Sequence, residues 1–218
     1  MQESVTYNMS SPEIQYLCAK DKRLAKVINT IGPISYIKGE ANDAYSFLVH
    51  EIIEQMLSKK AGDAIYRRLE AICENDVCPD KINRLSDEEL HSIGTSYSKV
   101  RYIRYLTHAV TSGEMCFELL ESLSDQEVMD SLMKIKGIGS WTAKMYLLFL
   151  LDRKNILPWE DVAFIQSYQW LYKTQDINAP AIKKKCKKWA PYASLAARYL
   201  YRALDAGLTK EEFHLYKN

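Results

Sequence analysis

The chain has 218 residues, of which 47% are hydrophobic and 26% are charged, and its formal net charge is +1 at pH 7. This length and balance are those of an ordinary globular protein, and 8 glycines and 6 prolines exclude a long low-complexity chain. The five cysteines and four histidines show no metal-ligand spacing, so we expect free thiols in a reducing compartment and no iron–sulfur cluster.

Membrane association and secretion are not expected. The longest apolar run, residues 145–151, is too short to span a bilayer. The first ten residues lack the basic start and apolar centre of a secretory signal. We therefore expect a cytoplasmic protein, associated with the nucleoid if the organism is bacterial.

Helical signals follow one another along the chain. Ser11-Pro12 predicts a helix start, and residues 44–59 carry apolar side chains at helical spacing. Capping-box patterns predict further helix starts after Ser86, Ser124 and Thr209. No run alternates with a period of two, so we predict no β-sheet. Connections are expected at 32–33, 38–43 and 151–160.

Two segments combine basic and aromatic residues without acids. Residues 97–110 hold three basic residues among tyrosines, and residues 177–204 hold seven, including the lysine run at 183–188. A basic stripe with aromatic residues suits a nucleic-acid backbone. For either stripe taken alone, a solvated helix face is the favoured interpretation, because it is the more common arrangement.

Residues 136–140, with the sequence KGIGS, predict a short turn between two helices, about 124–134 and 141–151. Glycine allows a positive φ and the close approach of another backbone. The unpaired amides at the start of the second helix suit a phosphate. Lys136 and Lys144 flank the turn. Any tight helical hairpin can use such glycines, so the turn alone is a hypothesis of phosphate binding.

Asp161 follows a proline-containing connection, residues 157–160. Local sequence allows two roles for this side chain, as the N-cap of the next helix or as a catalytic carboxylate. The two roles are compatible, because a carboxylate fixed at a helix start is rigid and ionised.

This order of elements resembles the helix-hairpin-helix-GPD superfamily of DNA base-excision glycosylases. Residues 52–58 (IIEQMLS) resemble the family's I-x-x-Q-[QL]-[LIV]-S helix, and the WAPYASLA and YLYR motifs within 189–202 resemble the ending of its 3-methyladenine DNA glycosylase II branch. The resemblance implies an all-α, two-lobed helical bundle with an active-site cleft between the lobes. Residues 41–151, ending in the helix-hairpin-helix at about 124–151, form one lobe, and 1–40 plus 152–218 form the other. The length matches the compact form without an N-terminal β domain.

One position separates the branches of this superfamily. Members that also cut the strand have a lysine just after the hairpin, as a Schiff-base nucleophile. This chain has Trp141 there, and Lys144 lies three residues further on. The resemblance is therefore to the alkylbase branch, which removes the base without cleaving the backbone.

The resemblance also implies a role for each site residue. Asp161 is the expected catalytic carboxylate, which stabilises positive charge on the sugar and orients or deprotonates the attacking water. Met56 is the expected wedge that fills the base stack, with Gln55 beside it, although Met56 also fits an apolar helix face. The expected base-pocket residues are Trp141, Tyr201, Met145 and Val162, the last two at positions where the family has tyrosines. The expected phosphate-binding residues are Lys136, Gly137, Gly139, Ser140, Thr142 and Lys144.

The implied function is hydrolysis of the N-glycosidic bond of flipped-out alkylated purines, such as 3-methyladenine and 7-methylguanine. The expected partner is double-stranded DNA that contains a damaged base, and the expected assembly is a monomer. No cofactor or metal is required, although a monovalent cation at the hairpin carbonyls near Gly137 and Gly139 is common in the family. Three alternatives remain: a glycosylase for oxidised or deaminated bases, a non-catalytic helix-hairpin-helix DNA-binding module, and a helical protein-interaction domain.

Overall fold

The computed structural model describes residues 3–215, so the outer ends of the predicted terminal lobe, 1–2 and 216–218, lie outside the described residues. The chain divides into two compact units. Unit 1 comprises residues 1–38 and 152–218, and unit 2 comprises Gly39–Leu151. Within the described range, no helix combines the length and the apolar character needed to cross a membrane.

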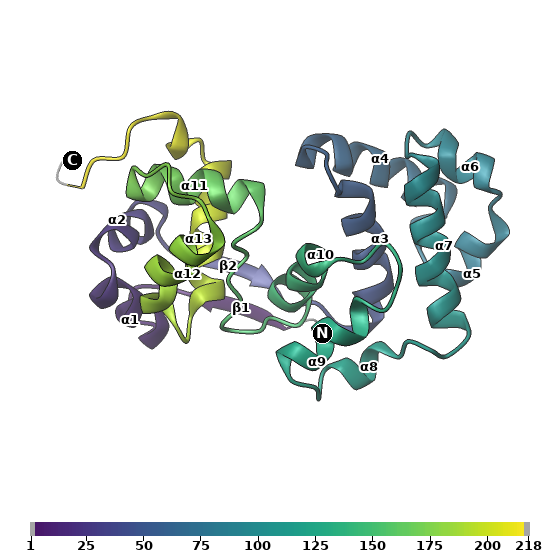
Figure 1. The fold of residues 1–218 in the computed structure, drawn as a ribbon, viewed down its shortest axis with the longest axis horizontal. Coiled ribbons are helices and arrows are strands. Elements are labelled where there is room, and N and C mark those ends of the chain that lie inside the picture. The colour runs from purple at the N-terminus through teal and green to yellow at the C-terminus, as the bar shows by residue number, and fades with distance from the viewer. Residues whose placement is uncertain (1–2, 216–218) are drawn as a thin grey trace. The chain divides into compact units, whose positions relative to one another are not determined.

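Unit 1 brings the two ends of the chain together around one central helix. That helix, α13, packs against α2 and α11, and α1 packs against α2 (Figure 1). A two-stranded antiparallel sheet places Val5 opposite Tyr36. The elements of unit 1 are β1 (Ser4–Tyr7), α1 (Pro12–Lys20), α2 (Lys22–Ile31), β2 (Ile34–Ile37), α11 (Val162–Tyr172), α12 (Ala179–Cys186), α13 (Ala193–Asp205) and the 3-10 turns Lys187–Trp189 and Leu208–Lys210.

Unit 2 is built around α3, whose apolar side chains are buried against its neighbours. This helix packs against α4, α7 and α10, and the π-helical turn after α10 continues that contact (Figure 1). The elements of unit 2 are the 3-10 turn Ala41–Asp43, α3 (Ala44–Glu54), α4 (Lys59–Ile72), α5 (Pro79–Arg84), α6 (Asp87–Ser92), α7 (Tyr97–Thr111), α8 (Phe117–Leu120), α9 (Asp125–Leu132), α10 (Ser140–Met145) and the π-helical turn Tyr146–Leu150.

The predicted all-α class is confirmed, and so are several helix starts. Pro12 begins α1, and Ser86 and Ser124 form complete capping boxes at the starts of α6 and α9. The helix predicted after Thr209 is wrong, because Leu208–Lys210 forms one 3-10 turn and Glu211 is extended. The prediction of no β-sheet is also wrong. Each of the two strands is only four residues long, which is too short for an alternating pattern to stand out.

The helix predicted for residues 44–59 is two helices. The first, α3, ends at Glu54, and α4 begins at Lys59 after Ser58 caps it by accepting a hydrogen bond from the Ala61 amide. The chain leaves the helix at Gln55 and takes a positive φ of 60° at Met56. Apolar spacing continues across this break, so the periodicity alone does not show it.

A buried carboxylate holds unit 1 together. Asp21 is 3% exposed and caps α2 by accepting hydrogen bonds from the amides of Arg23 and Leu24. Its other oxygen accepts from the Tyr172 hydroxyl, from Nε1 of Trp189 at 3.0 Å and from Nζ of Lys188 at 2.9 Å. Burial by itself would raise the pKa of Asp21, but these donors outweigh it and hold the pKa below its ordinary value.

The Asp21→Asn variant should lose about 3 kcal/mol of unfolding free energy near pH 7, because three donors face a neutral side chain. The pKa of Asp21 is lower in the folded state than in the unfolded state. Its stabilising contribution is therefore complete above the unfolded pKa, about 3.9, and is lost as pH falls through the folded value.

Urea unfolding at a series of pH values measures this effect. The difference between the wild type and Asp21→Asn should be constant from about pH 6 to 8 and should shrink below about pH 4. Glu88→Gln, which alters an exposed carboxylate, should stay within about 0.5 kcal/mol of the wild type. A difference that grows in acid would contradict this account of Asp21.

Candidate active site

The hairpin between α9 and α10 uses its two glycines differently. Gly137 has a φ of 100°, and a Cβ there would lie 2.2 Å from Cγ of Tyr102. Gly139 has a φ of −100°, and a Cβ there would meet nothing within 4 Å. The close approach at Gly137 is therefore to a side chain, and not to another backbone as the sequence suggested. Gly139 is the position that leaves open space in front of the start of α10.

The predicted phosphate-binding residues divide by exposure. Lys136 is exposed, with Nζ 5.3 Å from the centre of the Tyr105 ring, and Ser140 is partly exposed. Thr142 is 1% exposed, and Lys144 is 9% exposed with Nζ donating to Oγ of Ser140 at 3.0 Å. A phosphate contact through the side chain of Thr142 or Lys144 does not fit this burial. Those two side chains instead support the turn from within unit 2.

Gln55 joins the end of α3 to the hairpin. Its Nε2 donates to the Gly137 carbonyl at 2.9 Å and to Oγ1 of Thr142 at 3.3 Å. The ammonium of Lys99 closes the same helix end by donating to the carbonyls of Ile53 and Gln55, each at 2.7 Å. Burial lowers the pKa of Lys99. The position of Gln55 is thus fixed on both its backbone and its side chain.

Met56 stands outside the core. It is fully exposed and has a φ of 60°, in the left-handed region that residues other than glycine rarely adopt. Such a conformation costs on the order of 1–2 kcal/mol and persists only where neighbouring contacts enforce it. The bonds of Gln55 and Lys99 supply that constraint. Packing of Met56 in the apolar core, the alternative left open by the sequence, is wrong.

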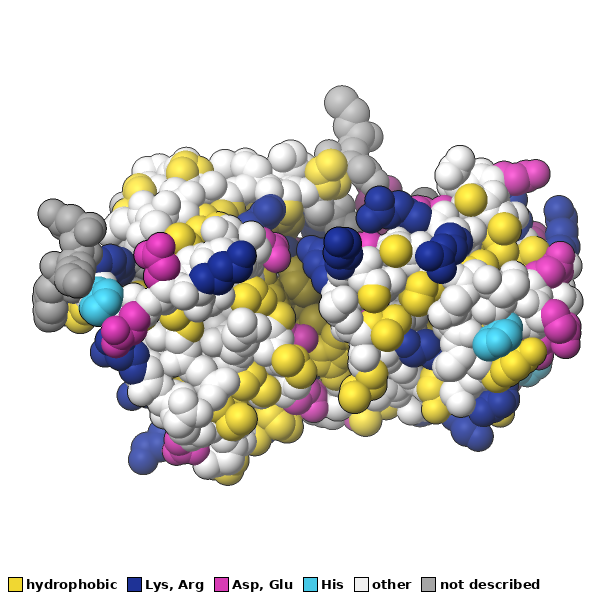
Figure 2. Space-filling model, turned by 90° about the horizontal axis from the view of Figure 1, so that it is seen from above, with side chains coloured by type: hydrophobic (Ala, Val, Ile, Leu, Met, Phe, Trp, Pro, Cys, Tyr) yellow, Lys and Arg dark blue, Asp and Glu magenta, His cyan; other side chains and the backbone are white. Residues whose placement is uncertain are grey.

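The first basic stripe serves mainly internal contacts. Arg104 donates to the carbonyls of Ile82 and Leu85 and pairs with Asp87 at 2.9 Å, and Lys99 closes α3. Figure 2 shows Lys and Arg side chains in separate groups among uncharged ones. The interpretation of residues 97–110 as one continuous backbone-binding stripe therefore does not fit.

Asp161 caps α11 in unit 1. Its Oδ1 accepts a hydrogen bond from the Phe164 amide at 2.7 Å, and the residue is 9% exposed. The amide of Asp161 donates to the Pro158 carbonyl, which closes the turn in front of the helix. The N-cap interpretation is confirmed. The catalytic interpretation stays compatible with it, because the cap fixes the carboxylate at one orientation.

The C-terminal motif fixes the segment that leads to Asp161. Oγ of Ser194 accepts from the Ile156 amide at 2.8 Å and donates to the Arg153 carbonyl at 2.5 Å. Trp189 of the same motif donates to Asp21. Sequence reasoning used this motif for resemblance alone and missed these contacts. The motif lies about 30 residues after Asp161 in the sequence. That spacing does not reveal that Ser194 contacts residues 153–156.

The four predicted base-pocket residues differ in exposure. Trp141 is partly buried on the first turn of α10, and Met145, one turn later, is 4% exposed and belongs to the core of unit 2. In unit 1, Val162 is 79% exposed beside Asp161, and Tyr201 on α13 is partly buried. Trp141, Val162 and Tyr201 keep surface available to a ligand, and Met145 keeps almost none.

The carbonyls named for a monovalent cation are both engaged. The Gly137 carbonyl accepts from Gln55, and the Gly139 carbonyl accepts from the Ala143 amide. An ion there would have to share both oxygens.

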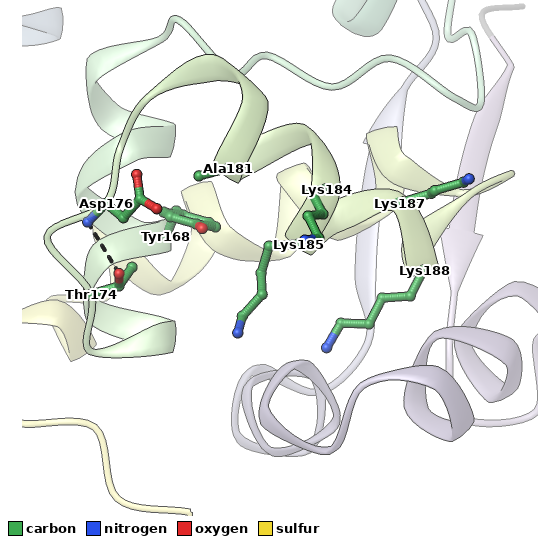
Figure 3. Close-up of a pocket in the computed structure, with 8 residues that line it drawn as sticks. All are labelled: Tyr168, Thr174, Asp176, Ala181, Lys184, Lys185, Lys187 and Lys188. Carbon is green, nitrogen blue, oxygen red and sulfur yellow. Dashed lines mark hydrogen bonds between the residues drawn. The ribbon is translucent and has the colours of Figure 1, made fainter.

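The lysine run borders a separate cavity of about 690 Å³ in unit 1 (Figure 3). Lys185 and Lys188 extend side by side, while Lys187 points away from them. Nζ of Lys185 and Nζ of Lys188 lie 5.1 and 5.2 Å from the Tyr172 ring centre, and Lys188 pairs with Asp21. Part of the run is therefore structural. The cavity is lined by Tyr168, Thr174, Asp176, Ala181, Lys184, Lys185, Lys187 and Lys188.

Comparison with known proteins identifies the family. Residues 49–191 match the model of the HhH-GPD superfamily base excision DNA repair proteins. The chain belongs to this superfamily. It is 30% identical to DNA-3-methyladenine glycosylase 1 of Schizosaccharomyces pombe over 207 residues, which is 92% of this chain and 90% of that protein.

Two solved structures share the fold over nearly the whole chain. A DNA-3-methyladenine glycosidase from Bacillus halodurans has a TM-score of 0.79 at 34% identity and covers 97% of both chains. An S. pombe 3-methyladenine DNA glycosylase in complex with abasic DNA has a TM-score of 0.82 at 27% identity and covers 89% of this chain and 97% of that one. The predicted resemblance to the HhH-GPD superfamily and to its 3-methyladenine glycosylase branch is confirmed.

The two hairpin glycines give a matched pair of variants. Gly137→Ala should lower the free energy of unfolding by at least about 2 kcal/mol. The added Cβ would clash with Cβ and Cγ of Tyr102, and the positive φ disfavours alanine. Gly139→Ala should stay within about 1 kcal/mol of the wild type, since its Cβ enters open space. Urea unfolding of both variants measures the difference, and equal losses would contradict the distinct roles of the glycines.

Proposed function

We infer that this chain is an alkylbase DNA glycosylase of base excision repair, which removes alkylated purines of the 3-methyladenine and 7-methylguanine type. The observation that carries this inference is the match over nearly the whole chain to proteins named as 3-methyladenine glycosylases, with Trp141 on the first turn after the hairpin. These alkylated purines are cationic, and an aromatic face attracts a cation by up to about 2 kcal/mol when water is excluded.

We propose that DNA binding starts at the hairpin. Gly139 leaves room for a phosphate in front of the amides of α10, and Lys136 beside it is exposed. The exposed side chain of Met56 would enter the base stack as the damaged nucleotide leaves it, a step that costs a few kcal/mol. Gln55 bonds to the carbonyl of Gly137, so the wedge and the phosphate site belong to one rigid assembly.

We propose that Asp161 acts on the sugar. As the glycosidic bond breaks, positive charge develops on C1′ and the ring oxygen, and a nearby carboxylate stabilises it. Burial of Asp161 strengthens this interaction, because screening by water is weak there. The carboxylate also orients or deprotonates the attacking water. A cationic base leaves readily, so the leaving group needs little acid catalysis.

The absence of lyase activity is part of this proposal. Strand cleavage by this superfamily needs an amine placed to attack C1′. The position after the hairpin is Trp141, and Lys144 is buried with its ammonium bonded to Ser140. The expected product is therefore an abasic site in an unbroken strand. A cytoplasmic, monomeric protein remains our proposal for location and assembly.

A non-catalytic DNA-binding module is the second candidate, and Asp161 argues against it. In a protein that only binds phosphates, Asp161 would serve as the N-cap of α11 alone, a role that needs no negative charge. The Asp161→Asn variant separates the two candidates. Asparagine caps helices about as well as aspartate, so the variant should fold with nearly unchanged stability.

Asp161→Asn should release alkylated bases at least about 100-fold more slowly than the wild type, because the neutral amide stabilises the sugar cation poorly. Its affinity for lesion DNA should stay within several-fold of the wild type. Single-turnover base release and a filter-binding titration measure the two quantities. Glu160→Gln, which alters the adjacent carboxyl group, serves as the control. Near-normal release by a folded Asp161→Asn protein would remove Asp161 from the mechanism.

A further inference from the structure

Three side chains of metal-ligating type meet where α3 packs against α4. His50 and Glu54 lie one turn apart on α3, and Asp63 lies on α4. Nε2 of His50 is 3.7 Å from Oε1 of Glu54 and 3.2 Å from Oδ1 of Asp63. The three ligand atoms all lie within 4.8 Å of one another. None of these residues takes part in the chemistry proposed above.

The two distances from Nε2 of His50, 3.7 and 3.2 Å, suit a shared ion. Ligands about 2.1 Å from a tetrahedral metal lie about 3.4 Å from one another. Nε2 of His50 is shielded from solvent and makes no hydrogen bond, although the Asp63 oxygen is only 3.2 Å away. That oxygen therefore lies off the axis along which the ring nitrogen points. Ligand atoms around a common ion have this relation, because each points at the ion and not at its neighbour.

Neighbouring groups restrict two of the three side chains, His50 and Glu54. The ring of Tyr66 contacts the His50 ring with centres 4.5 Å apart, which fixes the plane of the imidazole. The α4 backbone lies directly against Glu54, because a Cβ on Gly62 would be 2.5 Å from Cγ of Glu54. The glycine at this helical position thus makes room for the Glu54 side chain. Both features reduce the motion that metal binding would have to suppress.

We propose that His50, Glu54 and Asp63 bind one divalent transition-metal ion, with water completing its coordination. One imidazole nitrogen and two carboxylate oxygens suit Zn²⁺ and Co²⁺ better than Ca²⁺ or Mg²⁺, which favour all-oxygen sites. The ligands stand on both sides of the turn at residues 55–58. The ion ties the end of α3 to α4 and so stiffens the turn that presents Met56. This last consequence rests on the proposed function, whereas the binding of the ion does not.

Titration of the chelator-treated protein with Co²⁺ in the absence of DNA tests the site. The wild type should bind one Co²⁺ and show the weak visible bands of nitrogen and oxygen ligands. Saturation with Zn²⁺ at about 100 times its Kd should raise the melting temperature by roughly 5–10 °C. Binding should weaken in acid, because the metal competes with a proton for the imidazole.

His50→Gln and Asp63→Asn should each lose the visible bands and the Zn²⁺-dependent rise in melting temperature. His108→Gln is the matched control, because His108 on α7 faces Glu114, which follows that helix, at 3.9 Å in an exposed pair. Circular dichroism checks that each variant folds. Intense near-ultraviolet absorption would assign the ion to cysteine thiolates and overturn the proposal. So would undiminished binding by the two variants, or no binding by the wild type up to about 1 mM. Because no DNA is present, a failure here is distinct from a failure of the glycosylase assignment.

Discussion

The hydrogen bond from Gln55 to the Gly137 carbonyl is the contact on which the proposed DNA-binding site of unit 2 depends. It joins the end of α3 to the hairpin, two segments far apart in the sequence, at a distance of 2.9 Å. The ammonium of Lys99 completes the joint by closing the last carbonyls of α3. With both ends of the turn fixed, Met56 is held outside the core at a positive φ. The proposed phosphate site and the proposed wedge are therefore parts of one assembly.

Unit 1 holds the Asp161 carboxylate in a fixed and mostly buried position. Asp161 achieves this by capping α11, and Ser194 fixes the segment in front of it. Asp21 anchors the surrounding helices through donors from three side chains. A carboxylate fixed before the substrate arrives needs no reorganisation as charge develops on the sugar. Ser194 and Trp189 of the C-terminal motif thus make contacts inside unit 1, whereas Tyr201 of the same motif keeps surface available to a ligand.

Much of the fold could be predicted from local sequence. Ser86 and Ser124 gave correct helix starts, because a capping box is satisfied by neighbours three residues away. The break at Gln55 and the burial of Thr142 could not be predicted from local sequence, because both depend on contacts between distant segments. Resemblance supplied the roles that we propose for Asp161, Trp141 and Met56. It did not show that Lys99 and Arg104 are committed to helix ends, because periodicity does not reveal what a basic side chain faces.

The central claim is that this chain hydrolyses the bond to cationic alkylpurines and leaves the strand whole. Single-turnover release from a panel of oligonucleotides, each with one lesion, tests it most directly. We expect release of 7-methylguanine and 3-methyladenine, slow or no release of 8-oxoguanine and uracil, and product strands that break only after alkali. Preferential release of an oxidised or deaminated base would contradict the assignment to alkylpurines. Strand breaks before alkali would contradict the absence of lyase activity.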